Sequence, residues 1–112
     1  MENINNRIVL AAASFYKKSY YFNNDFSSLP TEVQQELRIF LTKTAEYIQG
    51  NICLGFYEEG QVFLEASGHE DDFDYDEIAA KYEVNRLIKD KKEFLNSLQL
   101  YYVYTVCNYE DF

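Results

Sequence analysis

The fold of this 112-residue chain is decided by residues 52–66, whose sequence is ICLGFYEEGQVFLEA. Bulky apolar residues alternate with smaller or amphipathic ones at Ile52, Leu54 and Phe56, and the alternation resumes at Val62. A period of two is typical of a strand with one buried face, and a Glu-Gly pair between two such runs is typical of a hairpin turn. These residues therefore predict two antiparallel strands joined at Gly60.

A helix is predicted just before this hairpin. Pro30 suits its first turn, and Thr31 and Gln34 have the spacing of a capping box. Gly50 is expected to supply the left-handed residue that commonly ends a helix. An apolar stripe at helical spacing joins Val33, Leu37, Phe40, Leu41, Thr44, Ala45 and Ile48.

An opening hairpin is predicted before the helix. Residues 8–13 are apolar on both alternating faces, as in a central strand, and residues 19–22 are aromatic and favour strand. The turn falls around residues 15–17. A helix remains the alternative, because Ile8, Phe15 and their neighbours also follow helical spacing.

Three further segments are predicted after the second hairpin. Residues 68–74 are an acidic loop, and residues 75–82 a short helix with acids in its first turn, where the helix dipole favours negative charge. A last helix begins at Arg86. Its end, residues 100–106, is apolar around the whole circumference, so a strand is the competing interpretation there.

The predicted element order is β-β-α-β-β-α-α. No repeat, linker or low-complexity segment divides the chain, so residues 1–112 are expected to form a single domain. Two hairpins that are each followed by helices indicate an α+β fold, with an antiparallel sheet of about four strands and the helices packed on one face.

Several segments spread along the chain are informative in combination. They are the opening apolar strand, residues 16–23, the Leu29-Pro30 helix entry, Tyr75-Asp76-Glu77-Ile78 and Leu100-Tyr101-Tyr102. Together they resemble an uncharacterised family of short acidic proteins from anaerobic Gram-positive bacteria. The resemblance covers essentially the whole chain and implies a single cytoplasmic domain, but it carries no known activity and transfers no catalytic residue.

The net charge of -9 is concentrated in one part of the chain. Residues 1–56 carry five basic and five acidic side chains, whereas residues 57–112 carry five basic and fourteen acidic ones. The sequence has no basic patch for phosphate contacts, which argues against nucleic-acid binding by charge. No apolar run reaches the length of a membrane-spanning helix, so no membrane contact is expected.

The two cysteines are expected to be buried, reduced thiols. Cys53 and Cys107 are far apart and form no CxxC motif, so neither a disulfide framework nor a zinc site is predicted. The apolar run near the N-terminus is too short for a usual secretory signal. These features predict a cytoplasmic protein.

The acidic loop is the first candidate site, as a docking surface for a basic protein partner. An ion-binding alternative rests on Asp72, Asp74, Asp76 and Glu83, which match four positions of an EF-hand loop, but the required glycine is replaced by Glu77. The other alternative is a solvated loop that caps a helix. The proposed docking surface consists of Glu70, Asp71, Asp72, Asp74, Asp76 and Glu77.

No catalytic set is predicted. His69 is the single histidine, and it lies among carboxylates that would raise its pKa and make it a poor base near neutrality. The glycines are isolated and form no phosphate-binding loop. We therefore predict no cofactor and no bound metal.

The tyrosine-rich end is the second candidate site. Tyrosine buries a large apolar area and keeps a hydroxyl that can remain hydrated, which suits an interface as well as the margin of a core. A homodimer is expected to form through Leu100, Tyr101, Val103 and Tyr104.

Taken together, the residues predict a non-enzymatic protein-interaction module with a regulatory or adaptor role. The alternative is a module that binds a small ligand or a divalent ion. Its pocket would lie between the sheet and the helices and be lined by aromatic side chains such as Phe40, Phe56 and Tyr102.

Overall fold

The two predicted hairpins join into one antiparallel sheet. The computed structural model describes residues 7–106. The first hairpin comprises β1 (Arg7–Ser14) and β2 (Ser19–Phe22), and the second comprises β3 (Asn51–Tyr57) and β4 (Val62–Ser67). The strand order β2-β1-β3-β4 places the first strands of the two hairpins side by side in the middle. The helical alternative for the opening segment is therefore wrong.

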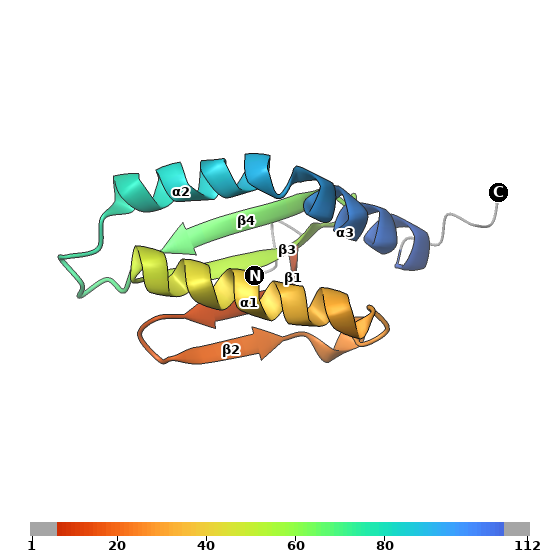
Figure 1. Cartoon of the computed structure of the whole chain (residues 1–112), viewed down its shortest axis with the longest axis horizontal. Helices are drawn as coiled ribbons and strands as arrows, with labels where there is room; N and C mark the ends of the chain where they lie inside the picture. Colours follow the sequence, from red (N-terminus) through yellow and green to blue (C-terminus); the bar gives the residue numbers. More distant parts are fainter. Residues whose placement is uncertain (1–6, 107–112) are drawn as a thin grey trace.

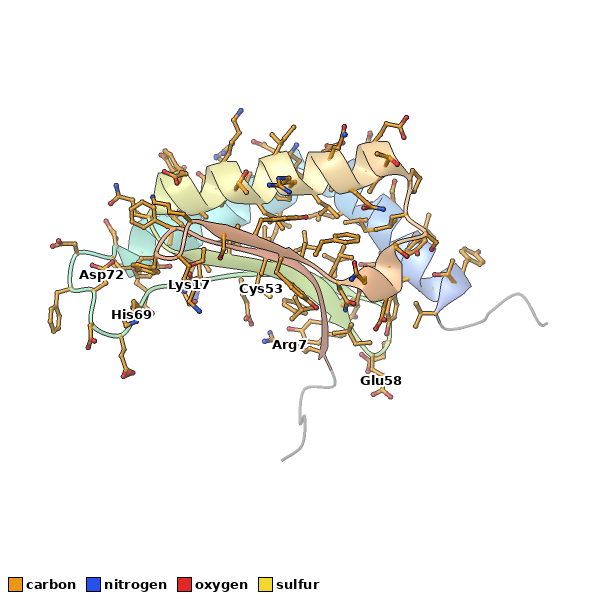
Figure 2. All side chains as sticks on the ribbon, turned by 90° about the horizontal axis from the view of Figure 1, so that it is seen from below. Arg7, Lys17, Cys53, Glu58, His69 and Asp72 are labelled. Carbon is orange, nitrogen blue, oxygen red and sulfur yellow. The ribbon has the colours of Figure 1, made fainter. Side chains whose placement is uncertain are left out.

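All helices lie on one face of the sheet. A short 3-10 helix, η1 (Asn24–Phe26), precedes α1 (Thr31–Ile48), and α2 (Glu77–Asp90) and α3 (Lys92–Thr105) follow the sheet. Figure 1 shows α1 crossing in front of β1 and β3, while α2 and α3 run along β4. Figure 2 shows the opposite face of the sheet without a helix over it. The predicted α+β architecture is confirmed.

A β-bulge lets β1 bury two consecutive residues. The register between β1 and β3 shifts between Val9 and Ala11, so Leu10 is the extra residue. A bulge bends a strand and redirects its side chains. Both Leu10 and Ala11 are consequently fully buried.

The core lies between the helices and the sheet, and aromatic rings fill one end of it. The Phe56 and Tyr102 rings stack with centroids 4.4 Å apart, and Phe26 packs against both. Phe56 is fully buried and Tyr102 nearly so. These two residues belong to the core, and neither lines the hollow that Phe40 borders.

The start of α1 differs from the predicted capping box. Pro30 is the N-cap residue, and no side chain caps the helix there. Thr31 already lies inside the helix, so its hydroxyl cannot occupy the capping position. Gln34 instead donates its amide to the carbonyl of Leu29 at 2.9 Å, which ties the preceding loop to the helix.

The left-handed residue at the end of α1 is Gln49, with φ 54°, and the prediction of Gly50 for this role was wrong. Gly50 is needed instead because a side chain at this position would collide with its neighbours. A Cβ atom at Gly50 would lie 2.5 Å from Cε1 of Tyr75, which follows the acidic loop and packs against the glycine. The glycine therefore permits a close contact between two parts of the chain.

The helix boundaries after the sheet also differ from the predicted ones. α2 begins at Glu77 and runs to Asp90 without a break at Tyr82. The break comes at Lys91, whose φ of -106° and ψ of 24° leave the helical region, and α3 continues from there. No Gly or Pro marks this position. Residues up to Thr105 are helical, so the strand alternative for residues 100–106 is wrong.

Cys53 is a free, half-buried thiol on β3. The second cysteine, Cys107, lies outside the described residues. Among residues 7–106, no helix is long and apolar enough to cross a membrane.

Candidate functional site

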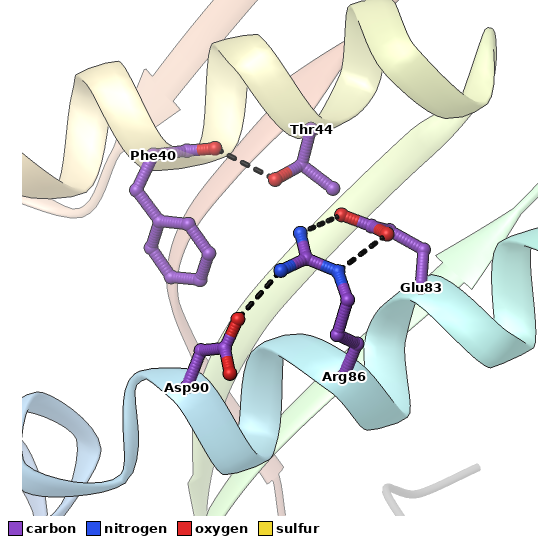
Figure 3. Close-up of polar contacts among 5 residues, drawn as sticks. All are labelled: Phe40, Thr44, Glu83, Arg86 and Asp90. Carbon is purple, nitrogen blue, oxygen red and sulfur yellow. Dashed lines mark hydrogen bonds and ion pairs between the residues drawn. The ribbon is translucent and has the colours of Figure 1, made fainter.

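A groove runs between α1 and α2 on the helical side of the molecule. It has a volume of about 1050 Å³ and is open to solvent. Figure 3 shows its two walls, with polar side chains of α2 directed toward α1. We refer to it as the α1–α2 groove. It is lined by Glu32, Gln35, Glu36, Ile39, Phe40, Lys43, Thr44, Glu46, Tyr47, Glu83, Arg86, Leu87 and Lys91.

The floor of the α1–α2 groove is apolar and belongs to the core. Phe40, Thr44 and Leu87 are each about 5–6 % exposed. The Thr44 hydroxyl donates to the Phe40 carbonyl at 2.8 Å, within its own helix (Figure 3). Since the proton of this hydroxyl is already donated, the floor offers a ligand mainly apolar contact.

A three-residue ion network lines the α2 wall. Arg86 donates Nε and Nη2 to the two carboxylate oxygens of Glu83, and Nη1 to Asp90 (Figure 3). The hydrogen bond with Glu83 raises the pKa of Arg86 above its already high value. The Glu83 side chain is only 10 % exposed, so its bidentate partner compensates a charge that has lost most of its water.

The rim of the groove combines neutralised charges with exposed apolar side chains. The Lys91 ammonium lies 3.5 Å from the Glu36 carboxylate and 5.2 Å from the centre of the Phe40 ring, so it joins the two helices. Ile39 and Tyr47 are 57 % and 74 % exposed. An apolar floor with apolar residues at the rim fits the apolar face of another molecule.

The acidic loop is attached to the opening hairpin through one tyrosine. The Tyr16 hydroxyl donates to Oδ2 of Asp72 at 2.8 Å and accepts the backbone N–H of His69 at 3.0 Å. Oδ1 of Asp72 accepts the backbone N–H of Asp74. Burial raises the pKa of Tyr16, and the neighbouring Asp72 raises it further, so this hydroxyl stays protonated and keeps donating.

Three of the four carboxylates that match an EF-hand pattern, those of Asp72, Asp76 and Glu83, have separate partners. Asp76 accepts the backbone N–H of Ala79 and caps α2, Asp72 holds Tyr16, and Glu83 binds Arg86 in the groove. Within residues 7–106, no group of three or more His, Cys, Asp or Glu side chains is arranged to hold a metal ion.

The rest of the predicted acidic docking surface faces solvent. Glu70, Asp71, Asp74 and Glu77 are exposed, and Phe73 in their midst is 95 % exposed. Figure 1 places this loop at the end of the molecule where α1 finishes and α2 begins. Its charge therefore lies at one mouth of the α1–α2 groove.

Cys53 and His69 do not form a nucleophile and base pair. Both line a hollow of about 310 Å³ on the face without helices, but Figure 2 shows Cys53 beneath the sheet and His69 out in the acidic loop. Burial raises the pKa of the Cys53 thiol, and Glu65 raises it further, against a lowering effect of Arg7. A thiol held in the protonated form is a poor nucleophile.

The predicted self-association surface is divided between two environments. Tyr101 shares a hydrogen bond with the Ser28 hydroxyl and is half-buried. Val103 packs on Gly60, where an added Cβ would lie 2.8 Å from its Cγ2 atom. Leu100 and Tyr104, one helical turn apart, are 58 % and 59 % exposed. Only these last two are directed mainly to solvent.

Two groove residues were named from the sequence, Phe40 for a ligand pocket and Glu83 for an ion site, but the groove itself was not predicted. The spacing of Glu83, Arg86 and Asp90 is that of ion pairs on a helix, and Leu87 interrupts this polar set at a core position. That combination is a signal of a charged wall beside a buried floor. It does not reveal that α1 lies opposite.

A family model described as "Family of unknown function (DUF6145)" matches residues 7–110, nearly the whole chain, and the chain belongs to this family. No curated protein and no solved structure matches it.

Proposed function

We propose that this member of a family of unknown function is a non-enzymatic, cytoplasmic interaction module, and that it binds a basic amphipathic helix of a partner protein in the α1–α2 groove. The observation that carries the proposal is the groove itself, an open apolar trough between two helices. Helices that dock in such grooves place an apolar stripe on the floor and keep their polar face in solvent.

The charges around the groove favour a basic helix. Arg86 and Lys91 are neutralised by carboxylates of the chain, so they add little positive potential. The exposed acids of residues 70–77 lie at one mouth. A partner with lysines or arginines beside its apolar stripe would be attracted to this end and would bind less tightly at high salt.

A binding role also suits the chemistry of the walls. Catalytic carboxylates and bases need pKa values adjusted to their reaction, whereas two acids of this groove, Glu83 and Glu36, are engaged in ion pairs with Arg86 and Lys91. We propose in addition that the protein has a regulatory or adaptor role. We also propose that its family consists of short acidic proteins of anaerobic Gram-positive bacteria.

The test uses a synthetic amphipathic peptide with a leucine stripe and a lysine face, titrated into the isotope-labelled protein. Expected are NMR shift changes along α1 and α2, with the floor residues Phe40 and Leu87 among the largest. Ile39→Asp should abolish binding. Ile78→Asp is the matched control, because Ile78 is 83 % exposed on α2 and does not line the groove.

Two outcomes contradict the proposal. One is equal binding of a peptide with glutamates in place of the lysines, which would remove the role of charge. The other is a set of shift changes that lies outside the groove.

Charge can also be tested from the protein side. Neutralising Asp71, Asp72 and Asp74 should weaken binding of the lysine peptide by about tenfold, or ~1.4 kcal/mol.

Self-association is a second proposal, favoured by the exposure of Leu100 and Tyr104 on one face of α3. Light scattering at tens of micromolar should report a dimer for the wild-type protein and a monomer for Leu100→Ser with Tyr104→Ser. The matched control is Ile78→Ser with Tyr82→Ser, which removes a similarly spaced exposed pair from α2. A monomeric wild-type protein would contradict this proposal.

A further inference from the structure

β4 forms an open edge of the sheet, and its free backbone groups can be assigned. Tyr57 donates its N–H to the Gln61 carbonyl, which closes the hairpin toward β3. The N–H of Val62, the next residue, donates to Oε1 of Gln99 on α3, so it points away from β3. Because hydrogen-bonding direction alternates along an antiparallel strand, the backbone groups of Leu64 and Ala66 also point outward.

These outward groups of Leu64 and Ala66 have no partner in a loop or helix of residues 7–106. An edge strand with free N–H and C=O groups is a template for another strand. β4 has six residues, so it offers a full strand length for pairing.

Space for a further strand lies along the same edge, between β4 and the helices α2 and α3. Two hollows of about 370 and 320 Å³ both include Leu64, Glu65 and Ile88 in their lining, so they are adjacent. Their apolar residues are Val62, Phe63, Leu64, Ala66, Val84, Ile88 and Leu95. Ile88 is 44 % exposed, so α2 presents an apolar side chain to this unfilled space.

Each hollow carries a lysine that forms no ion pair within residues 7–106. Lys92 lines the hollow at the start of β4, and Lys81 lines the one at its end. Glu65, which both hollows share, is already paired with Arg7 on the opposite face of the sheet. Glu77 is the one further acid in the two linings. Acidic side chains at both ends of a bound segment would therefore find positive partners.

The other edge of the sheet, formed by β2, offers less backbone for pairing with a further strand. β2 has only four residues, and the chain turns back at Asn23, which donates its backbone and side-chain N–H groups to the carbonyls of Leu10 and Val9. Very short edge strands resist pairing. The two edges of one sheet thus differ in their capacity for a further strand.

We propose that the β4 edge binds an extended acidic peptide segment of a partner protein as a fifth strand. Alternate side chains of that segment enter the two hollows beside α2 and α3, and its acidic ends pair with Lys81 and Lys92. Main-chain hydrogen bonds to Leu64 and Ala66 supply affinity, and the hollows supply specificity. This site is independent of the α1–α2 groove.

The test uses the peptide Glu-Thr-Val-Thr-Val-Thr-Glu, with blocked termini, and amide hydrogen exchange measured by NMR on the full chain. In the free protein, the amides of Leu64 and Ala66 should exchange faster than those of Phe63 and Glu65, which face β3. Saturating peptide should slow exchange at Leu64 and Ala66 by about tenfold or more and leave the α1–α2 groove unchanged.

Matched variants identify the contacts. Ile88→Glu should abolish peptide binding, whereas Ile78→Glu, on the same helix and outside the hollows, should leave it unchanged. If the Ile88→Glu variant does not fold, the double variant Lys81→Glu with Lys92→Glu provides a second measurement of peptide binding. That double variant should prefer the peptide Lys-Thr-Val-Thr-Val-Thr-Lys, which the wild-type protein should bind at least about tenfold more weakly than the acidic peptide.

Three results would overturn the proposal. The first is unchanged exchange at Leu64 and Ala66 in about 1 mM acidic peptide. The second is equal affinity of the wild-type protein for the acidic and basic peptides. The third is protection of these amides that rises with protein concentration alone, since a second copy of the chain would then be the occupant.

Discussion

The acidic loop and the α1–α2 groove are adjacent, yet they are built in opposite ways. The loop draws its charge from consecutive residues, and its carboxylates are either exposed or used to hold local backbone, as at Asp76. The groove draws its lining from two helices far apart in the chain, and its floor at Leu87 is part of the core.

This difference means that the two regions contribute unequally to the stability of the fold and to the binding of a partner. A side chain in the groove floor contributes to both, because the same buried surface holds the helices on the sheet and faces a ligand. A carboxylate in the loop contributes mainly to the electrostatic field around the molecule. Substitutions in the two regions should therefore differ in their effect on the free energy of unfolding, and four measurements can establish or refute this.

The largest effect is expected from Leu87→Ala in the groove floor. The residue is 6 % exposed, so the change leaves a cavity and should lower the free energy of unfolding by about 2–5 kcal/mol. Urea denaturation measures it. Ile88→Ala, at the next residue of the same helix, is the control and should lower the free energy of unfolding by clearly less. Equal losses would show that the floor is not part of the core.

A smaller loss is expected from Arg86→Ala on the groove wall. The change leaves the Glu83 carboxylate, which is 10 % exposed, without its bidentate partner, so the urea midpoint should fall. Combining it with Glu83→Leu removes the uncompensated charge and should recover most of the loss. A double variant that is less stable than Arg86→Ala would contradict the role assigned to this ion pair.

Next in size is Asp76→Ala at the boundary between the loop and α2. Loss of the cap that accepts the Ala79 N–H should cost about 1 kcal/mol. Asp76→Asn should retain most of the stability, because an amide oxygen also accepts this hydrogen bond. Thermal unfolding of both variants provides the comparison, and an equal loss for Asn would assign the effect to charge instead.

The smallest change in stability is expected from the loop itself. Glu70→Gln, Asp71→Asn and Asp74→Asn together should alter the free energy of unfolding by no more than about 0.5 kcal/mol, because all three side chains are exposed. Urea denaturation at low and high salt checks this. A loss greater than that of Leu87→Ala would reverse the contrast between loop and groove.

Much of the fold could be predicted because its signals are local. Alternation around Leu54 and Leu64 predicted the second hairpin, and the stripe through Leu37 and Leu41 predicted the helix before it. The break at Lys91 could not be predicted, since no residue there forbids a helix and the change of direction depends on packing against the sheet. The role of Gly50 depends in the same way on Tyr75, which is distant in sequence.

Less of the candidate site could be predicted. The sequence located the concentrated charge of residues 70–77, and most of these acids do face solvent. It also led to a self-association surface in which Tyr101 and Val103 proved to pack within the chain, because periodicity alone does not show which side of an apolar helix its own fold covers.

By itself, the sequence determined the four strands, the helical segments and the position of the acidic charge, because hydrophobic periodicity and charge are properties of neighbouring residues. Only the tertiary structure decided that α1 and α2 leave a groove floored by Phe40 and Leu87, and that β4 ends the sheet with free backbone groups. Both features depend on the distances between elements, which follow from how whole faces pack and not from the order of residues within any one of them.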